Sequence, residues 1–366
     1  MSASGENVAT AQSVGASGPY HEVRIARIVR ETADAASFVL DVPEEIADRF
    51  AYRAGQFLTF RVRVGEERLV RCYSLASSPD TDDELKVTVK RIEEGRVSNW
   101  MNETLAVGDV LEAMRPAGVF CLQERTTPLV LFAGGSGITP VISILKSALA
   151  TSARSVRLVY ANRDRDAIIF REELDALGAR HGDRLEVIHR LDVEDGFVDR
   201  EAVERYIGDD LDADFYVCGP GPFMDTVEAA LEARRVPAEQ IFIERFVSLT
   251  AEEHAAGMPA AAATGGALRE PGDAAPTTVS IRIDGELHEV PYVPGQTLLE
   301  AAQAAGLEPP FACEEGYCSC CMAKLAAGRV RMLTNDALDE DQVEEGWVLT
   351  CQSIPLCDEI EVDYPD

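Results

Sequence analysis

The sequence has little positive charge and no long apolar run. Its 366 residues include 64 Asp and Glu but only 34 Lys and Arg, which gives a net charge of -30 at pH 7. Nucleic acids and anionic membranes recruit Lys and Arg, so this balance argues against both as partners. Because no stretch of 18 apolar residues occurs, a membrane-spanning segment is not expected either.

An export signal is also missing. Residues 1–19 have neither a basic region nor an apolar core, so we interpret them as a disordered tail rather than a signal peptide. The chain nevertheless contains nine cysteines. Without an export signal they favour the reducing cytoplasm, where clustered cysteines more often serve metal or redox chemistry than disulfides.

The chain divides into three folded units and a linker. Short alternating apolar runs in residues 20–124 predict an antiparallel β-barrel. Apolar strands alternating with helical stretches in residues 125–246 predict an α/β domain with a parallel sheet. Residues 247–276 are rich in Ala, Gly and Pro and are interpreted as a linker. Residues 277–366 predict a compact α+β unit that starts with a hairpin at Asp284-Gly285.

The densest chemical signal is "CEEGYCSCC" at 313–321, which we call the cysteine loop. Cys313, Cys318 and Cys321 have the C-x4-C-x2-C spacing of plant-type [2Fe–2S] sites, which require one more distant cysteine. Cys351 follows an apolar strand that can return it to the loop. Cys320 is then surplus, at a position where a small residue suffices. A zinc site is the alternative, but zinc usually pairs one C-x2-C with a second.

Two further stretches suggest nucleotide binding. "GGSGITP" at 134–140 follows an apolar strand and opens a helix, so its small residues and the helix N-terminus favour phosphate binding. It is not a G-x-G-x-x-G motif, and an ordinary tight turn is the alternative interpretation. "CGPGPFM" at 218–224 follows a later strand of the same predicted sheet. A reactive-nucleophile role for Cys218 lacks a nearby histidine.

These stretches resemble known families. Residues 277–366 resemble plant-type ferredoxins, whose fold is a β-grasp. "RCYS" at 71–74, "VTVKR", "VSNWM", "GSGITP" and "CGPGPFM", in this order, resemble the ferredoxin–NADP reductase superfamily. The whole chain from about residue 20, except the linker, resembles the reductase components of bacterial 3-ketosteroid 9α-hydroxylase. Phenylacetyl-CoA epoxidase reductases are also similar.

The resemblance implies a flavin site. Tyr73 would pack on the isoalloxazine, Ser74 would hydrogen-bond near N5, and Arg71 would pair with the phosphates. Glu244 and Phe246 would lie against the ring. FAD is favoured, although similar reductases carry FMN. The remaining implied flavin ligands come from the same strand and from the phosphate-binding stretch: Cys72, Val89, Lys90, Gly95, Val97 and Ser98.

The resemblance also implies a pyridine-nucleotide site between two loops. Thr139 would lie near the flavin and Cys218 near the nicotinamide. Ser74, Thr139, Cys218 and Glu244 are therefore the implied catalytic residues. The other implied nucleotide ligands are small residues of the two loops: Gly134, Gly135, Ser136, Gly137, Gly219 and Pro220.

The predicted activity is that of an oxidoreductase in an electron-transfer chain. Electrons would pass from NADH through FAD and a [2Fe–2S] cluster to a terminal oxygenase, with a Rieske-type steroid ring hydroxylase favoured. NADPH remains an alternative donor, and a di-iron acyl-CoA epoxidase an alternative partner. A redox-sensing iron–sulfur binding module is the alternative of another class. Because residues 277–366 carry 18 Asp and Glu against 4 Lys and Arg, the partner is expected to present a basic docking face.

Overall fold

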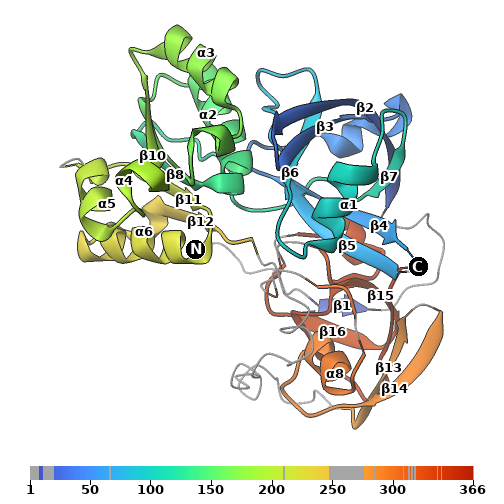
Figure 1. The fold of residues 1–366 in the computed structure, drawn as a ribbon. Helices are drawn as coiled ribbons and strands as arrows, with labels where there is room; N and C mark the ends of the chain where they lie inside the picture. The colour runs from blue at the N-terminus through green and yellow to red at the C-terminus, as the bar shows by residue number, and fades with distance from the viewer. Residues whose placement is uncertain are drawn as a thin grey trace.

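The computed structural model describes three folded units. It covers the backbone at 8–10 and the residues 20–65, 67–208, 211–246, 276–283, 285–307, 309–311, 314, 316, 319–335, 337–338 and 340–365. Figure 1 shows a blue-to-cyan barrel unit in contact with both a green-to-yellow unit and an orange-to-red unit. The predicted linker, apart from Pro276, lies outside the described residues.

The first unit is a six-stranded antiparallel sheet with the strand order β5-β4-β7-β2-β3-β6. Its two edges meet, because Leu75 bridges Val87 and the Ala76 N–H donates to the Lys86 carbonyl at 2.7 Å. This closure turns the sheet into the predicted barrel. The elements are β2 (His21–Thr32), β3 (Ala35–Asp41), η1 (Glu44–Phe50), β4 (Phe57–Val64), β5 (Glu67–Ser74), β6 (Leu85–Lys90), α1 (Arg96–Thr104) and β7 (Val110–Ala113).

The second unit is a five-stranded parallel sheet in the order β10-β9-β8-β11-β12. Apolar clusters on its two faces are covered by helices, as expected for the near-continuous apolar strands of a parallel sheet. Its strands are β8 (Leu129–Gly134), β9 (Val156–Asn162), β10 (Leu185–Leu191), β11 (Asp214–Cys218) and β12 (Ile241–Glu244). Its helices are η2 (Gly135–Gly137), α2 (Ile138–Thr151), η3 (Arg165–Ala167), α3 (Arg171–His181), α4 (Asp192–Asp195), α5 (Arg200–Ile207), α6 (Gly221–Ala233) and η4 (Ala238–Gln240).

The third unit packs helix α8 (Leu298–Ala304) on a mixed five-stranded sheet in the order β14-β13-β19-β15-β17. A capping box between Thr297 and Glu300 starts this helix. The predicted hairpin joins β13 to β14, and β13 pairs in parallel with β19, which gives the predicted β-grasp arrangement. The other elements are β13 (Thr278–Ile283), β14 (Glu286–Pro291), β15 (Met322–Ala327), β16 (Arg329–Met332), α9 (Glu340–Glu344), β17 (Trp347–Leu349), β18 (Ser353–Pro355) and β19 (Glu361–Asp363).

One element differs from the expected disordered tail. Val8–Thr10 forms strand β1, which pairs antiparallel with β16 of the third unit. Backbone pairing with a distant strand can order three residues that carry no local signal of their own. In the part of the chain that the structure describes, no helix is both long and apolar enough to cross a membrane.

Candidate cofactor sites

The "RCYS" stretch forms the end of strand β5, at the edge of the barrel. Leu69 and Tyr73 pack against the barrel core, whereas Val70 and Cys72 pack in a separate small cluster. Successive side chains on a strand alternate between its faces, so one face of β5 packs on the barrel core and the other on the small cluster. The predicted isoalloxazine neighbour Tyr73 lies beside Phe60, with ring centroids 6.2 Å apart.

The other predicted flavin residues of this strand lie beside Tyr73. Arg71 is half-buried, and its guanidinium donates to the Val70 carbonyl at 2.7 Å. Ser74 is buried and pairs with Phe57 of β4. The end of β5 thus carries a planar cation and a hydroxyl, the two groups that a flavin phosphate and a flavin ring would require.

The predicted phosphate-binding residues surround the N-terminus of α1. Val89 and Lys90 end strand β6, and α1 follows with Gly95 as its N-cap. A side chain at Gly95 would collide with the Ile92 side chain at 2.3 Å and with the Ser98 hydroxyl at 2.4 Å. Backbone N–H groups at a helix N-terminus favour anions. Packing within the chain thus requires glycine at position 95, and the N-terminus of α1 offers N–H groups that suit a pyrophosphate.

The two glycine-rich loops meet at the switch point of the parallel sheet. The loop after β8 leads into α2, and the loop after β11 leads into α6. A Cβ at Gly137 would lie 2.2 Å from the Cys218 carbonyl, and one at Gly134 would lie 2.7 Å from the Pro220 ring. Only glycine allows this approach. Ligands of open α/β sheets bind at such a switch point, so both loops are placed for a nucleotide.

Two of the three predicted catalytic residues of the second unit lie on neighbouring strands of this region. Cys218 and Glu244 are paired in register at the ends of β11 and β12, and both are buried. Burial, reinforced by the Glu244 carboxylate, raises the pKa of Cys218 well above its usual value, so its sulfur stays a neutral thiol. Thr139 is buried in the first turn of α2 and donates to the Ser136 carbonyl at 3.0 Å. Phe246 is 41% exposed beyond β12.

The structure brings the predicted flavin and nucleotide regions side by side. A Cβ placed on Gly135 would lie 3.7 Å from the Lys90 ammonium of the barrel. The chain after β5 continues into contact with α2, where Ser78 and Ser147 hydroxyls lie 2.7 Å apart and the Ser143 hydroxyl donates to the Ser77 carbonyl. A nucleotide over the second unit would therefore face a flavin on the first.

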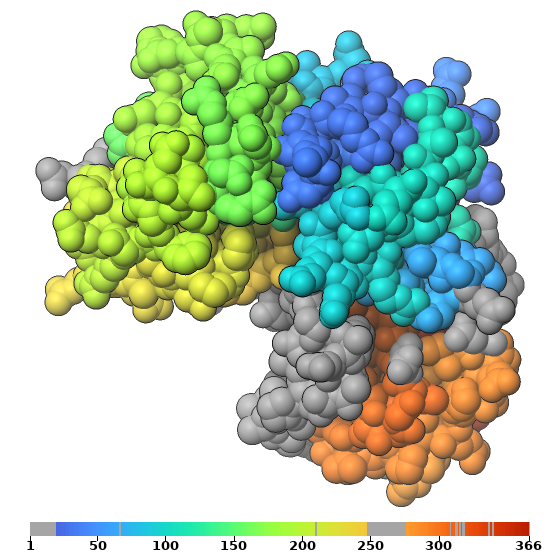
Figure 2. Space-filling model, viewed as in Figure 1, coloured from blue at the N-terminus to red at the C-terminus, as the bar shows by residue number. Residues whose placement is uncertain are grey.

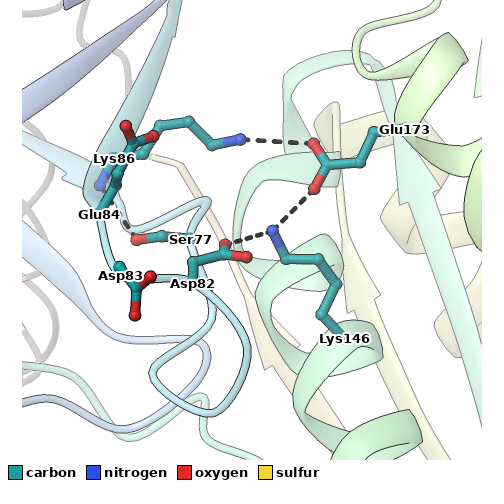
Figure 3. A pocket seen from close by; sticks show the side chains of 7 residues that line it. All are labelled: Ser77, Asp82, Asp83, Glu84, Lys86, Lys146 and Glu173. Carbon is teal, nitrogen blue, oxygen red and sulfur yellow. Dashed lines mark hydrogen bonds and ion pairs between the residues drawn. The ribbon is translucent and has the colours of Figure 1, made fainter.

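An ion-pair network that the sequence did not predict fixes this interface (Figure 3). Lys146 of α2 is only 4% exposed and bridges Asp82 of the barrel and Glu173 of α3. Lys86 of β6 also pairs with Glu173, at 3.3 Å. Burial raises the pKa of Asp82, but hydrogen bonds from Lys146 and from the Ser78 N–H outweigh it and hold the pKa below its usual value. The pocket that these side chains line contains none of the predicted cofactor residues.

The cysteine loop is partly described. Cys321 and Cys351 are buried, and Thr350 donates its N–H and its hydroxyl to the Cys321 carbonyl at 3.2 and 2.9 Å. The antiparallel pair of β15 and β17 ends at this point, so the sheet brings the two predicted ligands to one place. Cys313 and Cys318 lie outside the described residues.

The described loop backbone is tightly wound. Glu314, Gly316 and Ser319 have φ values of 56°, 88° and 57°, in the left-handed region. A Cβ on Gly316 would lie 2.9 Å from the Thr334 carbonyl, so glycine is needed there. Such backbone, together with the buried thiols of Cys321 and Cys351, fits the sulfur-rich donor set that a [2Fe–2S] cluster requires.

Family models match each unit. An oxidoreductase FAD-binding domain matches residues 22–121, an oxidoreductase NAD-binding domain matches residues 131–229, and a 2Fe-2S iron-sulfur cluster binding domain matches residues 281–356. The protein is therefore an oxidoreductase that binds FAD, NAD and a [2Fe–2S] cluster, and the predicted cofactors are confirmed. The roles of individual residues remain predictions.

Several relatives match nearly the whole chain. The chain is 42% identical over 343 residues to the 3-ketosteroid-9-alpha-monooxygenase ferredoxin reductase component of Rhodococcus rhodochrous, covering 93% of this chain and 95% of the relative. It is 32% identical to a component of the 1,2-phenylacetyl-CoA epoxidase of Escherichia coli, covering 94% of this chain and 98% of the relative. Phthalate dioxygenase reductase, a solved structure, shares 25% identity and a TM-score of 0.57, covering 94% and 98% of the two chains. The chain belongs to the family of ferredoxin reductase components of 3-ketosteroid-9-alpha-monooxygenase.

Proposed function

We propose that this chain delivers electrons from NADH to a terminal oxygenase of the Rieske type that hydroxylates a steroid ring. Relatives at 42% identity that are named for 3-ketosteroid-9-alpha-monooxygenase support the steroid assignment. When bound, the flavin accepts two electrons from the nicotinamide and the cluster carries them onward singly. The protein's own residues bind these groups, align them and keep them close together.

One observation carries this proposal: the cysteine loop rests against the flavin strand. The sulfur atoms of Cys72 in β5 and Cys320 in the loop lie 2.9 Å apart. In the sequence, Cys72 directly precedes the predicted flavin neighbour Tyr73, and Cys320 directly precedes the predicted cluster ligand Cys321. This contact between the first and third units supports direct electron transfer between the flavin and the cluster.

The proposed units follow from these placements. Residues 20–124 would bind FAD, residues 125–246 NADH and residues 277–366 the cluster, with residues 1–19 as a tail and residues 247–276 as a linker. Arg71 and the N-terminus of α1 would hold the flavin phosphates, and the N-terminus of α2 the phosphates of the nucleotide. The buried Cys218 and Glu244 would close the site behind the nicotinamide. The cytoplasm is the proposed location, supported by the cysteine-rich sequence.

Reconstitution tests the proposed partner. The protein with bound FAD and [2Fe–2S] cluster, mixed with NADH and a purified 3-ketosteroid oxygenase component, should give hydroxylated steroid. When a di-iron epoxidase replaces the oxygenase, little product should form. The epoxidase is the second candidate because the relative from the phenylacetyl-CoA epoxidase is 32% identical over nearly the whole chain. Faster turnover with the epoxidase would reverse the assignment.

The nucleotide preference follows from "YANRDRD" at the end of β9. A 2′-phosphate needs available basic side chains. Here the Arg163 guanidinium pairs with Asp164 at 2.7 Å, and Asp164 also accepts from the N–H groups of Asp166 and Ala167. The second arginine of this stretch, Arg165, lies between Asp164 and Asp166, so the acidic neighbours of both arginines would repel a phosphate. We expect kcat/KM to be higher for NADH than for NADPH.

A variant sharpens this test. Asp164→Asn should raise kcat/KM for NADPH relative to NADH severalfold, because it removes a negative charge beside Arg163. Asp183→Asn, in the turn before β10, serves as a control that should leave the ratio unchanged. A wild-type preference for NADPH, or no response to Asp164→Asn, would contradict this interpretation of the acidic neighbours.

The proposed docking face of the oxygenase is basic. Residues 277–366 have a net charge of -14, and Glu314 and Glu315 belong to the cysteine loop. Complementary fields accelerate encounter and fix orientation. Electron transfer to the oxygenase should therefore slow as salt reduces the Debye length from about 30 to about 8 Å.

Charge reversal should have the same effect. A Glu314→Lys/Glu315→Lys double variant should slow delivery to the oxygenase but leave flavin reduction by NADH unchanged. Glu286→Lys/Glu289→Lys, on the exposed strand β14, is the matched control with the same change in net charge. If both double variants slow delivery equally, overall charge rather than the loop controls docking.

A further inference from the structure

The barrel and the third unit share a contact surface around β4 and β5. Met114 of the barrel packs in the apolar core of the third unit, and the Arg61 guanidinium donates to the Pro365 carbonyl at 3.3 Å. Arg61 also lies over the Tyr20 ring, 4.2 Å from its centroid. In Figure 2 the orange third unit lies directly against the blue-to-cyan barrel. Apolar and polar contacts therefore join the two units at this surface.

Two cysteines face each other within this surface. Cys320 is 2% exposed and packs against Phe57, Ala117 and Val70 of the barrel. Its sulfur lies 2.9 Å from that of Cys72, which is only partly buried. The sulfurs of a disulfide lie about 2.05 Å apart, so the two sulfurs would have to approach by about 0.9 Å.

We propose that Cys72 and Cys320 form a reversible disulfide between the barrel and the third unit when the protein meets hydrogen peroxide. The partly exposed Cys72 reacts first. Its sulfur takes a hydroxyl from the peroxide, the O–O bond breaks, and the other oxygen leaves as water with the thiol proton. The buried Cys320 sulfur then attacks the Cys72 sulfur, the S–O bond breaks, and a second water leaves with the Cys320 proton. Two thiols thus lose two electrons to one peroxide.

A disulfide at this position would prevent the third unit from separating from the barrel. Cys72 is itself an implied flavin ligand and Cys320 precedes the predicted cluster ligand Cys321, and the bond joins the barrel to the third unit. The third unit could then still receive electrons from the flavin while being unable to leave it. Disulfides in the cytoplasm are typically transient and redox-sensing, and a dithiol would reverse this one by exchange. The effect on delivery to an oxygenase rests on the proposed function, whereas the bond does not.

Peptide mapping of the loaded protein tests the bond. After brief peroxide treatment and alkylation, trypsin should give peptide 72–86 linked to peptide 283–324, and iron content should be unchanged. Dithiothreitol should remove the link. Cys320→Ser and Cys320→Ala should abolish it, whereas Cys357→Ser, which changes a half-buried thiol of the same unit beside Arg329 and Glu359, should not.

Three outcomes would overturn the proposal. The linked peptide could be absent while Cys72 is oxidised to a sulfinic acid, the link could persist in the Cys320 variants, or it could form only as iron is lost. A second readout uses the oxygenase: peroxide should stop electron delivery in the wild type and not in Cys320→Ser, while ferricyanide reduction by NADH continues in both. Failure of the untreated protein to serve the oxygenase would count against the proposed function and not against the disulfide.

Discussion

Replacing Cys321 or Cys351 with serine should strip the protein of most of its iron. Both thiols are buried where β15 and β17 end, next to the hydrogen bonds between Thr350 and the Cys321 carbonyl. A serine hydroxyl is a harder and less acidic donor than a thiol, and iron–sulfur clusters are held by thiolates. Iron and acid-labile sulfide per chain, together with the visible absorption, measure the loss. The serine variants of Cys313 and Cys318 should behave alike.

Cys320→Ser is the internal control for this series. It changes the same kind of atom one residue from Cys321, yet it should keep its iron, because the Cys320 sulfur faces Cys72 of the barrel. The serine variants of the four predicted cluster ligands should still reduce ferricyanide with NADH through the flavin. They should lose electron delivery to the oxygenase. Loss of iron from Cys320→Ser with retention in Cys321→Ser would reassign the ligands, and zinc in the purified wild type would reject the cluster.

Arg71→Ala should release the flavin. The half-buried guanidinium is placed at the end of β5, and charge-assisted hydrogen bonds to phosphate are worth about 1.5–3 kcal/mol. Since about 1.4 kcal/mol is tenfold in an equilibrium constant, the Kd for FAD should rise by roughly 10- to 150-fold. Fluorescence titration of the apoprotein with FAD measures this change directly.

Two further variants separate binding from alignment. Arg68→Ala removes an exposed arginine of the same strand, opposite Arg63, and should leave the Kd for FAD unchanged. Ser74→Ala should slow flavin reduction by NADH more than it weakens FAD binding, because its hydroxyl is predicted to lie near N5. An unaltered Kd in Arg71→Ala would remove Arg71 from the phosphate site.

The fold class followed from local patterns in the sequence. Alternating apolar runs marked the barrel strands, continuous apolar runs marked the parallel sheet, and Asp284-Gly285 marked the hairpin between β13 and β14. These signals depend on residues close together in the chain, so sequence alone reveals them. The three predicted cluster ligands of the cysteine loop were also identified from a local pattern, the spacing of their cysteines. The fourth, Cys351, was predicted because it follows an apolar strand that can return it to the loop.

Contacts between units could not be predicted in the same way. The bridge of Lys146 to Asp82 and Glu173, the meeting of Cys72 with Cys320 and the pairing of β1 with β16 join residues far apart in sequence. Nothing local distinguishes Lys146 from a solvated lysine on an amphipathic helix until the barrel is docked on α2. The surplus Cys320 was noticed for its position in the loop, but its neighbour became visible only in three dimensions.

The contact of the third unit with the barrel also determines how the reaction depends on concentration. Because donor and acceptor belong to one chain, electron transfer between them is first order, and dilution does not slow it. Delivery to a separate oxygenase is second order and falls with dilution. The face that buries Cys320 against Phe57 and Ala117 is covered while the units are docked, so an oxygenase that used the same face would bind only after they separate. At a low oxygenase concentration we therefore expect most of the protein to hold a reduced cluster, because its electron is transferred only when an oxygenase molecule binds.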